Sequence, residues 1–446
     1  MSSAVVRARC WFAVAAAGMA VVACSGGGAD GDGVPVTMSL SAAVATPSQV
    51  DLSWSAHPDP VTGYDVVRNG AAAWPTHLGG TSFSDHHLDP DTRYCYRVFA
   101  VVFPVGVVGG SNEACVRTLA TTGWAVSVID AAGGRFVSLA RGAGDTLHVS
   151  YHDGASQSLK YATNASGSWV TSTLATGGAG FGGTSIALHT DGSVHISYND
   201  YTAATGAAGL AYATNASGAW VAATVDAAGG WATSLRLDPT GNAHISYSRG
   251  APNHDLRYAT NASGAWVTTF ITGFSNNIQR TSLALDSAAA AHIGYAVGNG
   301  ACAIRYATNA PAPWTDSLVA GAARCGVALA LDTMDKAHLG YPTSSELVHA
   351  TNATGAWVSS TVDQFNAVPG SDASIAIDTA DKIHLAYQDH NSDLKYATDA
   401  PGTWATFWID SRGDVGSANA LTVDAGTVDI VYLDATRQAL NHARSP

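Results

Sequence analysis

The chain has 446 residues and a net charge of −13 at neutral pH, with 12% charged and 47% hydrophobic residues. Leaving out Arg7 and Arg9 of the N-terminal segment, 34 acidic residues stand against 19 basic ones, a balance of −15. Such a chain is repelled by nucleic acid and by anionic lipid, so neither is expected as a partner. There is no G-x-S-x-G segment and no metal-ligand cluster, and we expect no cofactor and no metal.

The N-terminus has the layout of a secretory signal. Residues 1–23 carry Arg7 and Arg9, then the apolar run WFAVAAAGMAVVA, then Cys24. The ending VVAC resembles the lipobox of bacterial lipoproteins, which implies lipidation at Cys24. The alternative is a plain signal peptide cleaved elsewhere. With Ser25 next, the resemblance implies a lipid-anchored monomer of the bacterial cell envelope, at the outer membrane or cell surface, that contacts the membrane only through its lipid.

Residues 24–35 form a Gly-rich tether, and residues 36–119 form a separate domain. VDLSWS and GYDVVRNG are predicted to be strands. The segment LDPDTRYCYRVFAV follows them, about 40 residues after Trp54. The L-x-P-x-T-x-Y-x-Y-x-V-x-A run resembles a fibronectin type III module. The resemblance implies a β-sandwich with Tyr94 as its tyrosine-corner residue. It also places Cys95 and Cys115 on the last two strands, where they would form a disulfide in an oxidising compartment.

Residues 120–446 consist of about seven copies of one repeat. Three series mark it: an aromatic-Ala pair, a His followed three residues later by Tyr, and a Trp after a TNASG-type turn. The members of the first series are Tyr161, Tyr212, Tyr258, Tyr306, His349, Tyr396 and His442; those of the second are His148, His195, His244, His292, His338 and His384, with Asp429 in the seventh copy; those of the third are Trp124, Trp169, Trp220, Trp266, Trp314, Trp357 and Trp404.

Each copy holds four short segments rich in β-branched or aromatic residues, separated by hairpin-turn sequences. Four strands in 43–51 residues is typical of a propeller blade. The array begins with a fourth-strand segment at 124–130 and ends with a third-strand segment at 439–443. Pairing the two removes two exposed edges. We therefore predict an all-β protein: a sandwich followed by a seven-bladed β-propeller whose ring closes in a one-plus-three pattern.

The repeated histidines invite a metal or catalytic interpretation, but six equivalent copies around a ring cannot converge on one ion. We expect each to serve its own blade, by a bond to the Asp that ends the preceding strand (Asp238, Asp286, Asp332 and Asp378). The Asn residues of the turns are expected to act as Asx-type turn residues, or as glycan acceptors in a eukaryote.

Function is expected where the copies differ, in the loops after the second strand and before the first strand, which share one face. Candidate ligand-binding residues there are Asp153, Asp200, Asp389, Asp434, Arg135, Arg249, Arg280, Arg412, Phe181 and Trp231. The alternative role for each Asp is a turn or blade-to-blade hydrogen bond. Cys302 and Cys325 have no counterparts in other copies and fall on this face; we favour a disulfide over a metal pair.

The repeat is loosely similar to the sialidase-like propellers. That resemblance implies an arginine cluster, a Tyr–Glu pair and an acidic Asp, yet the repeat region contains only one Glu, Glu346, and lacks the S-x-D-x-G-x-T-W box. We therefore expect a non-catalytic, surface-anchored binding or adhesion protein for carbohydrate or a cell-surface protein. The alternatives are a glycoside hydrolase or lyase that uses Asp, Arg and Tyr on the loop-rich face, and a structural scaffold.

Overall fold

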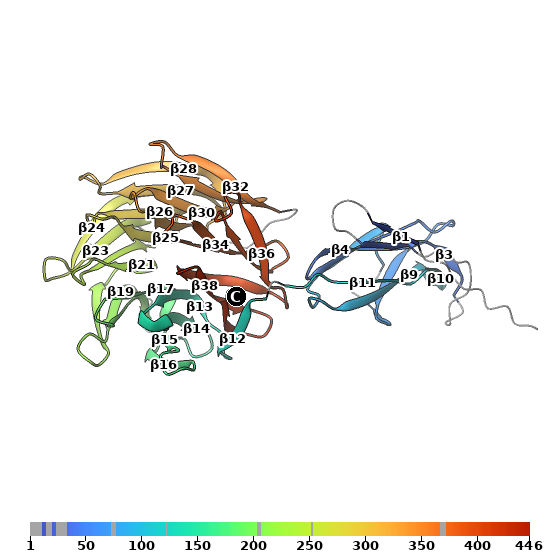
Figure 1. Ribbon diagram of the computed structural model, residues 1–446, viewed down its shortest axis with the longest axis horizontal. Helices are drawn as coiled ribbons and strands as arrows, with labels where there is room; N and C mark the ends of the chain where they lie inside the picture. The colour runs from blue at the N-terminus through green and yellow to red at the C-terminus, as the bar shows by residue number, and fades with distance from the viewer. Residues whose placement is uncertain are drawn as a thin grey trace, which may run out of the picture. The chain divides into compact units, whose positions relative to one another are not determined.

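A computed structural model describes residues 11–14, 20–23, 34–72, 77–121, 123–202, 207–250, 253–365 and 372–446. The chain divides into two compact units, Met1–Thr121 with Ser411–Gly413, and Thr122–Asp410 with Asp414–Pro446. Both are built from β-strands (Figure 1). The described part of the chain contains no helix with the length and apolar character that a membrane crossing requires.

The first unit contains two larger sheets and a short antiparallel pair of strands. One sheet joins β4 (Leu40–Thr46), β5 (Gln49–Trp54) and β8 (Ser82–Asp85), and the short pair consists of β1 (Trp11–Val14) and β2 (Ala20–Ala23). The other sheet contains β3 (Val36–Met38), β10 (Gly106–Ser111), β9 (Arg93–Val102), β6 (Gly63–Arg68), β7 (Ala71–Ala72) and β11 (Ala114–Arg117). In the two larger sheets all pairs but the parallel pair β3–β10 are antiparallel. The predicted lipidation site, Cys24, lies outside the described residues.

The core of this unit is aromatic. Trp54 and Tyr64 meet edge to face with ring centroids 5.7 Å apart, and Tyr96 is fully buried. The hydroxyl of Tyr94 accepts the N–H of Asp89 at 2.9 Å, which ties the start of β9 to the turn before it. The predicted disulfide between Cys95 and Cys115 is present and joins β9 to β11.

Among the described residues, the second unit contains seven antiparallel sheets of four strands each. In pairing order they are β13–β16 (Arg135–Arg141, Leu147–Asp153, Ser158–Thr163, Val170–Ala175), β17–β20 (Ala179–Leu188, Val194–Thr202, Ala207–Thr214, Val221–Asp226), β21–β24 (Trp231–Leu237, Ala243–Arg249, Asp255–Thr260, Val267–Gly273), β25–β28 (Ile278–Leu285, Ala291–Asn299, Ala301–Thr308, Thr315–Ala323), β29–β32 (Ala328–Leu331, Ala337–Pro342, Glu346–Thr351, Val358–Gln364), β33–β36 (Ala373–Ile377, Ile383–Gln388, Leu394–Thr398, Ala405–Asp410), and β37 (Val415–Asp424), β38 (Thr427–Asp434), β39 (Ala439–Arg444) and β12 (Ala125–Asp130).

The sheets form a closed ring, which is consistent with a β-propeller. The first strand of each sheet lies beside the first strand of the next, and β37 returns to β13. First strands such as β13, β17, β21 and β25 lie toward the centre, and fourth strands such as β16, β24 and β28 lie at the outside (Figure 1). The last sheet combines β12 with the three C-terminal strands, so the two ends of the repeat array are hydrogen-bonded to each other.

Serine hydroxyls join the inner strands. The innermost strand of each sheet has one edge without a β-partner, and its N–H groups need acceptors. Four of them find one in the preceding sheet: Ser138 Oγ accepts from Ile186, Ser185 Oγ from Leu235, Ser234 Oγ from Leu283, and Ser282 Oγ from Leu329, at 2.9–3.1 Å. The same repeat position thus links one sheet to the next.

An aromatic belt joins the sheets farther out. Each aromatic-Ala residue meets the repeat Trp of another sheet, with centroids 5.1–5.6 Å apart, in the pairs Tyr161–Trp220, Tyr212–Trp266, Tyr258–Trp314, Tyr306–Trp357, His349–Trp404, Tyr396–Trp124 and His442–Trp169. The predicted His–Asp bonds are also present, at 3.2–3.4 Å, from His244, His292, His338 and His384 to Asp238, Asp286, Asp332 and Asp378.

The hairpin turns between the third and fourth strands share one side-chain hydrogen bond to the second strand. In the first complete copy the side chain of Asn164 accepts the N–H of Leu147 at 2.7 Å, and Gly167 in the same turn has a positive φ of 87°. Equivalent bonds are made by Asn215, Asn261, Asn309, Asn352 and Asp399. The repeated Asn is therefore a turn residue, because its amide oxygen satisfies the first N–H of the second strand.

Ser234→Ala tests the inner-strand link. The change leaves the N–H of Leu283 without its acceptor in a buried position, and we expect the free energy of unfolding of the ring to fall by about 1–3 kcal/mol. Urea denaturation followed by tryptophan fluorescence measures it. Ser217→Ala, in an exposed turn, is the matched control. Equal free energies of unfolding for the two variants would show that the hydrogen bond from Leu283 to Ser234 does not stabilise the ring.

His349→Tyr tests the acid sensitivity of the belt. His349 replaces the Tyr of five other copies and stacks on His338, with Nε2 and Nδ1 2.9 Å apart. Burial, and secondarily His338, lower the pKa of His349 to about 4. Unfolded histidine titrates near 6.5, so the unfolded state binds more protons as pH falls from about 6.5 to 4, and folding loses up to about 3 kcal/mol.

We expect His349→Tyr to reduce this acid-induced loss, as measured by urea denaturation at pH 7 and pH 4.5. Burial also lowers the pKa values of His148, His195, His244 and His384, and these residues keep part of the pH dependence in the variant. His87→Tyr, at an exposed position of the first unit, should leave the pH dependence unchanged. An unaltered pH profile in His349→Tyr would contradict the assignment.

Candidate functional site

The centre of the ring is hollow. One space of about 180 Å³, here called the ring cavity, is lined by residues from the first strands of all seven sheets. A second space of about 260 Å³, the mouth cavity, is lined by Phe136, Gly182, Gln279, Cys325 and neighbours. The two cavities share Val137, Thr184, Thr233, Arg280, Thr281 and Asp372.

The backbone around the mouth is irregular. The ladders of five first strands shift register at this end, as between Trp231 and Ser234. Phe136, Ala232 and Ala418 have φ values of 54°, 53° and 48°, and each stands two residues before the position of the linking serine. Such conformations cost non-glycine residues about 1–3 kcal/mol and persist where surrounding structure holds them. Two of these residues, Phe136 and Ala232, line the mouth cavity.

The same position carries the two charges of the mouth. Arg280 and Asp372 each stand two residues before the serine position of their copy, and their side chains form an ion pair between residues 92 positions apart in sequence. Their sheets are not adjacent, because β29–β32 lies between them. Gly326 occupies this position in the intervening sheet and adds no side chain. Asp372 also accepts the N–H of Ala418 at 3.1 Å, so the pair ties three sheets together.

Arg236 lines the ring cavity but not the mouth cavity. Its guanidinium donates to the carbonyl of Leu235 at 2.8 Å, and it makes no ion pair with any described residue. Arg236 is half-buried, and desolvation of its guanidinium by the surrounding protein lowers the pKa of Arg236. Arginine stays protonated in proteins, so a positive charge without a carboxylate partner lies within the ring.

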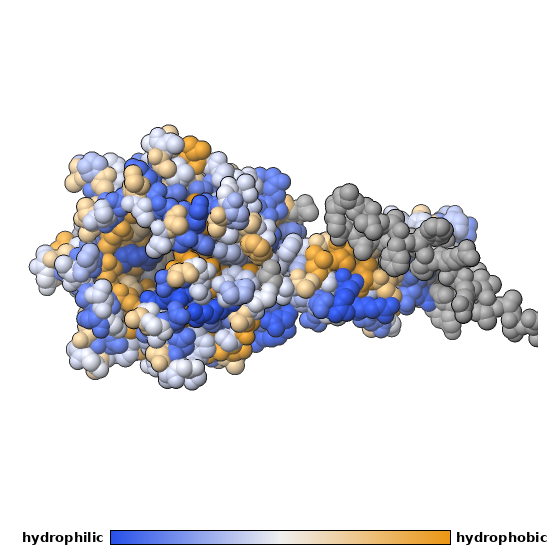
Figure 2. Space-filling view, viewed as in Figure 1, coloured by the Kyte–Doolittle hydropathy of each residue, from blue (hydrophilic) through white to orange (hydrophobic). Residues whose placement is uncertain are grey.

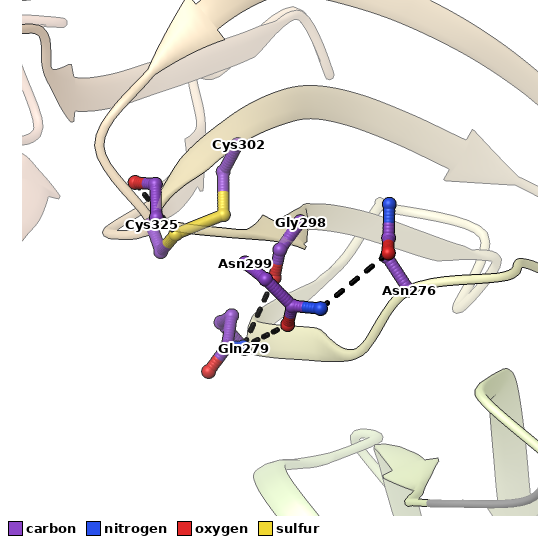
Figure 3. Close-up of a disulfide and its surroundings, with 7 residues drawn as sticks. Asn276, Gln279, Gly298, Asn299, Cys302 and Cys325 are labelled. Carbon is purple, nitrogen blue, oxygen red and sulfur yellow. Dashed lines mark hydrogen bonds between the residues drawn. A yellow bond between two sulfur atoms is a disulfide. The ribbon is translucent and has the colours of Figure 1, made fainter.

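The predicted disulfide between Cys302 and Cys325 is present and stands at the rim of the mouth (Figure 3). It joins β27 to the segment that leads into β29, so it couples two neighbouring sheets. Beside it the amide of Gln279 donates to the carbonyl of Gly298 at 3.0 Å and approaches Asn299 Oδ1 at 3.4 Å. The covalent link and these bonds fix this side of the rim.

Three of the predicted aspartates hold turns instead of lining either cavity. Burial opposes ionisation of Asp153, but hydrogen bonds from Ser156 and Lys160 outweigh it and lower the pKa to about 2. Asp434 accepts from the backbone N–H and the side chain of Arg437. Asp389 accepts two backbone N–H groups, and burial raises its pKa. All three are nearly inaccessible, so we leave them out of the candidate site.

The other predicted residues are dispersed. Arg280 lines both cavities, and Trp231 flanks the mouth, where a Cβ at Gly182 would lie 2.3 Å from its ring. Arg135 is exposed next to Phe136, Asp200 lies on β18 opposite Gly209, and Arg249 forms an ion pair with Asp255. Arg412 belongs to the segment grouped with the first unit. The side chain of Phe181 lies outside the described structure.

Sequence reasoning missed Phe136, Arg236 and Asp372. A comparison of the copies position by position contains the signal for Arg236. The position two residues after the linking serine is Ala140, Ala187, Ala284, Ala330, Ala376 and Thr422 in the other sheets, and only the third sheet has a charged residue there. The Arg280–Asp372 pair has no such signal, because its two members belong to non-adjacent copies.

No protein-family model and no curated protein matches this chain. Solved structures with some similarity include virginiamycin B lyase from Staphylococcus aureus (TM-score 0.48, 12% identity, 72% of this chain and 99% of that one). Others are AofleA from Arthrobotrys oligospora (0.45, 14%, 65% and 90%) and the Aleuria aurantia lectin with a fucoside (0.45, 11%, 63% and 96%). With TM-scores below 0.5, these similarities assign no ligand or activity to this chain.

Removing the rim disulfide should destabilise the ring. The bond spans 23 positions, and chain-entropy arguments for such a loop give about 3 kcal/mol. We expect the Cys302→Ala, Cys325→Ala double variant to unfold at a correspondingly lower urea concentration under non-reducing conditions. Treating the natural chain with reductant should approach the same midpoint. An unchanged midpoint in the double variant would show that the rim is held by other contacts.

Proposed function

We propose that this chain is a lipid-anchored envelope protein whose ring binds carbohydrate without turning it over. In this proposal residues 1–23 are the signal peptide, Cys24 carries the lipid and residues 36–119 are a fibronectin type III-like spacer. Residues 120–446 are a seven-bladed propeller with one-plus-three closure. The spacer is supported by the Tyr94–Asp89 bond and the Cys95–Cys115 disulfide, and the closure by the pairing of β12 with β39.

The observation that carries the proposal is the composition of the mouth cavity. An aromatic residue, Phe136, lines one opening together with the Arg280–Asp372 pair and the polar residues Gln279, Thr184 and Thr233. Sugars present apolar C–H faces and many hydroxyls, and pockets that bind them combine an aromatic surface with convergent polar groups. The visible face of the ring is a mixture of hydrophilic and hydrophobic residues, which suits a polar ligand (Figure 2).

The glycoside hydrolase or lyase alternative has less support. Retaining and inverting hydrolysis both need two carboxyl groups about 5–10 Å apart. Among the described residues that line the two cavities, Asp372 is the only one with a carboxylate, and it is paired with Arg280. The scaffold alternative does not explain why a charged pair and an aromatic ring surround an open cavity.

A glycan array probed with the labelled full-length mature chain tests the proposal. We expect reproducible binding that Arg280→Gln and Phe136→Ala each weaken at least about tenfold, or about 1.4 kcal/mol. Arg93→Ala, an exposed position in the first unit, is the control and should bind as the natural chain does. An empty array favours the scaffold, and release of product from a bound glycan favours the enzyme.

A further inference from the structure

We propose that the ring cavity contains an anion site, in which Arg236 binds a compact monoanionic oxyanion group, a carboxylate. This goes beyond the proposed function, because the site lies within the ring, at a residue that does not line the mouth cavity. No other copy of the repeat has a charged residue at the position of Arg236. The argument has three parts: the donors in the cavity, the charge balance and the repeat register.

The ring cavity is lined by hydrogen-bond donors that have no acceptor among the described residues. Arg236 has five N–H donors, and its guanidinium makes one hydrogen bond within the described part of the chain, to the carbonyl of Leu235. The linking serines accept a backbone N–H each, but Ser185 and Ser234 donate their own O–H to no described residue. Both line the cavity with Arg236. A ligand that offers only acceptors satisfies all of these groups, as an oxyanion does.

The charge of the cavity calls for a single negative ligand. The charged residues that line it are Arg236, Arg280 and Asp372, and the last two form an ion pair with each other. This leaves one positive charge, on Arg236. A planar guanidinium matches the two oxygens of a carboxylate in a bidentate arrangement. The volume of about 180 Å³ is below that of ordinary ligand pockets, so it admits a group of a few non-hydrogen atoms.

The register shows that the fold itself does not need Arg236. Five of the other six sheets have Ala at this position and the sixth has Thr. Alanine therefore completes the packing between inner strands, and partly desolvating a guanidinium there without a carboxylate carries a free-energy cost. A costly group at a position where the repeat otherwise takes Ala is expected where it serves a ligand.

Thermal unfolding of the full chain at pH 7.5 tests the site, with sodium acetate replacing sodium chloride at constant ionic strength. At ten times its dissociation constant, acetate should raise the midpoint of the natural chain by about 2 °C. Arg236→Ala should lose this shift, and Arg236→Lys, which keeps the charge but not the fork, should lose most of it. Arg93→Ala should keep it in full. Without acetate, Arg236→Ala should unfold at or above the midpoint of the natural chain.

An equal acetate shift in the natural chain and in Arg236→Ala, or no shift in either, overturns the anion site. Because acetate is the probe, the outcome does not depend on the glycan array. A positive acetate result with an empty array removes only the proposed carbohydrate binding. Binding of glycans with no acetate effect removes only the anion site.

Discussion

The ring depends on how the inner edge of each sheet is satisfied. A four-stranded sheet has two edges, and the inner one faces a cavity too narrow for another strand. In four of the seven copies the protein meets this constraint with a serine hydroxyl, which accepts an N–H of the next inner strand, as Ser234 does for Leu283. Since a buried unpaired N–H costs about as much as a lost hydrogen bond, this position fixes the register of neighbouring sheets. The arrangement of the cavity follows from it.

The link is incomplete in one part of the ring, and different contacts replace it there. Ala328 and Ala420 stand in the serine position and have no hydroxyl to accept the next N–H. Ser374 instead donates to Asn419 at 2.6 Å, and Asp372 accepts the N–H of Ala418. The ion pair from Arg280 reaches the same region. Asp372 thus stands where the hydroxyl links between inner strands are missing, and its contacts with Arg280 and Ala418 hold the sheets together there.

Much of the fold could be predicted because the same residue types recur at the same positions of each copy of the repeat. His, Tyr, Trp and Asn recur at fixed positions, and the structure uses them for the bonds and contacts expected of buried groups, such as His244 to Asp238. The aspartates after the second strand were harder to interpret. Asp153 and Asp434 end β14 and β38 where the variable loops begin, and each accepts hydrogen bonds from the turn that follows it. Sequence alone does not distinguish a carboxylate that binds its own turn from one that faces a ligand.

The candidate site could be predicted only in part, for two physical reasons. Arg280 and Asp372 are 92 positions apart, and their contact depends on the ring's diameter and on the small residue Gly326 between them. Arg236 differs from this pair, because aligning the copies shows that five of the other six have Ala at its position. In a repeat protein the copies can be compared with one another. Residues that the fold requires recur in the copies, so a residue that differs between copies stands out. What remains at Arg236 is a half-buried charge that packing does not explain and that has no carboxylate partner among the described residues, and the proposed anion would supply that partner.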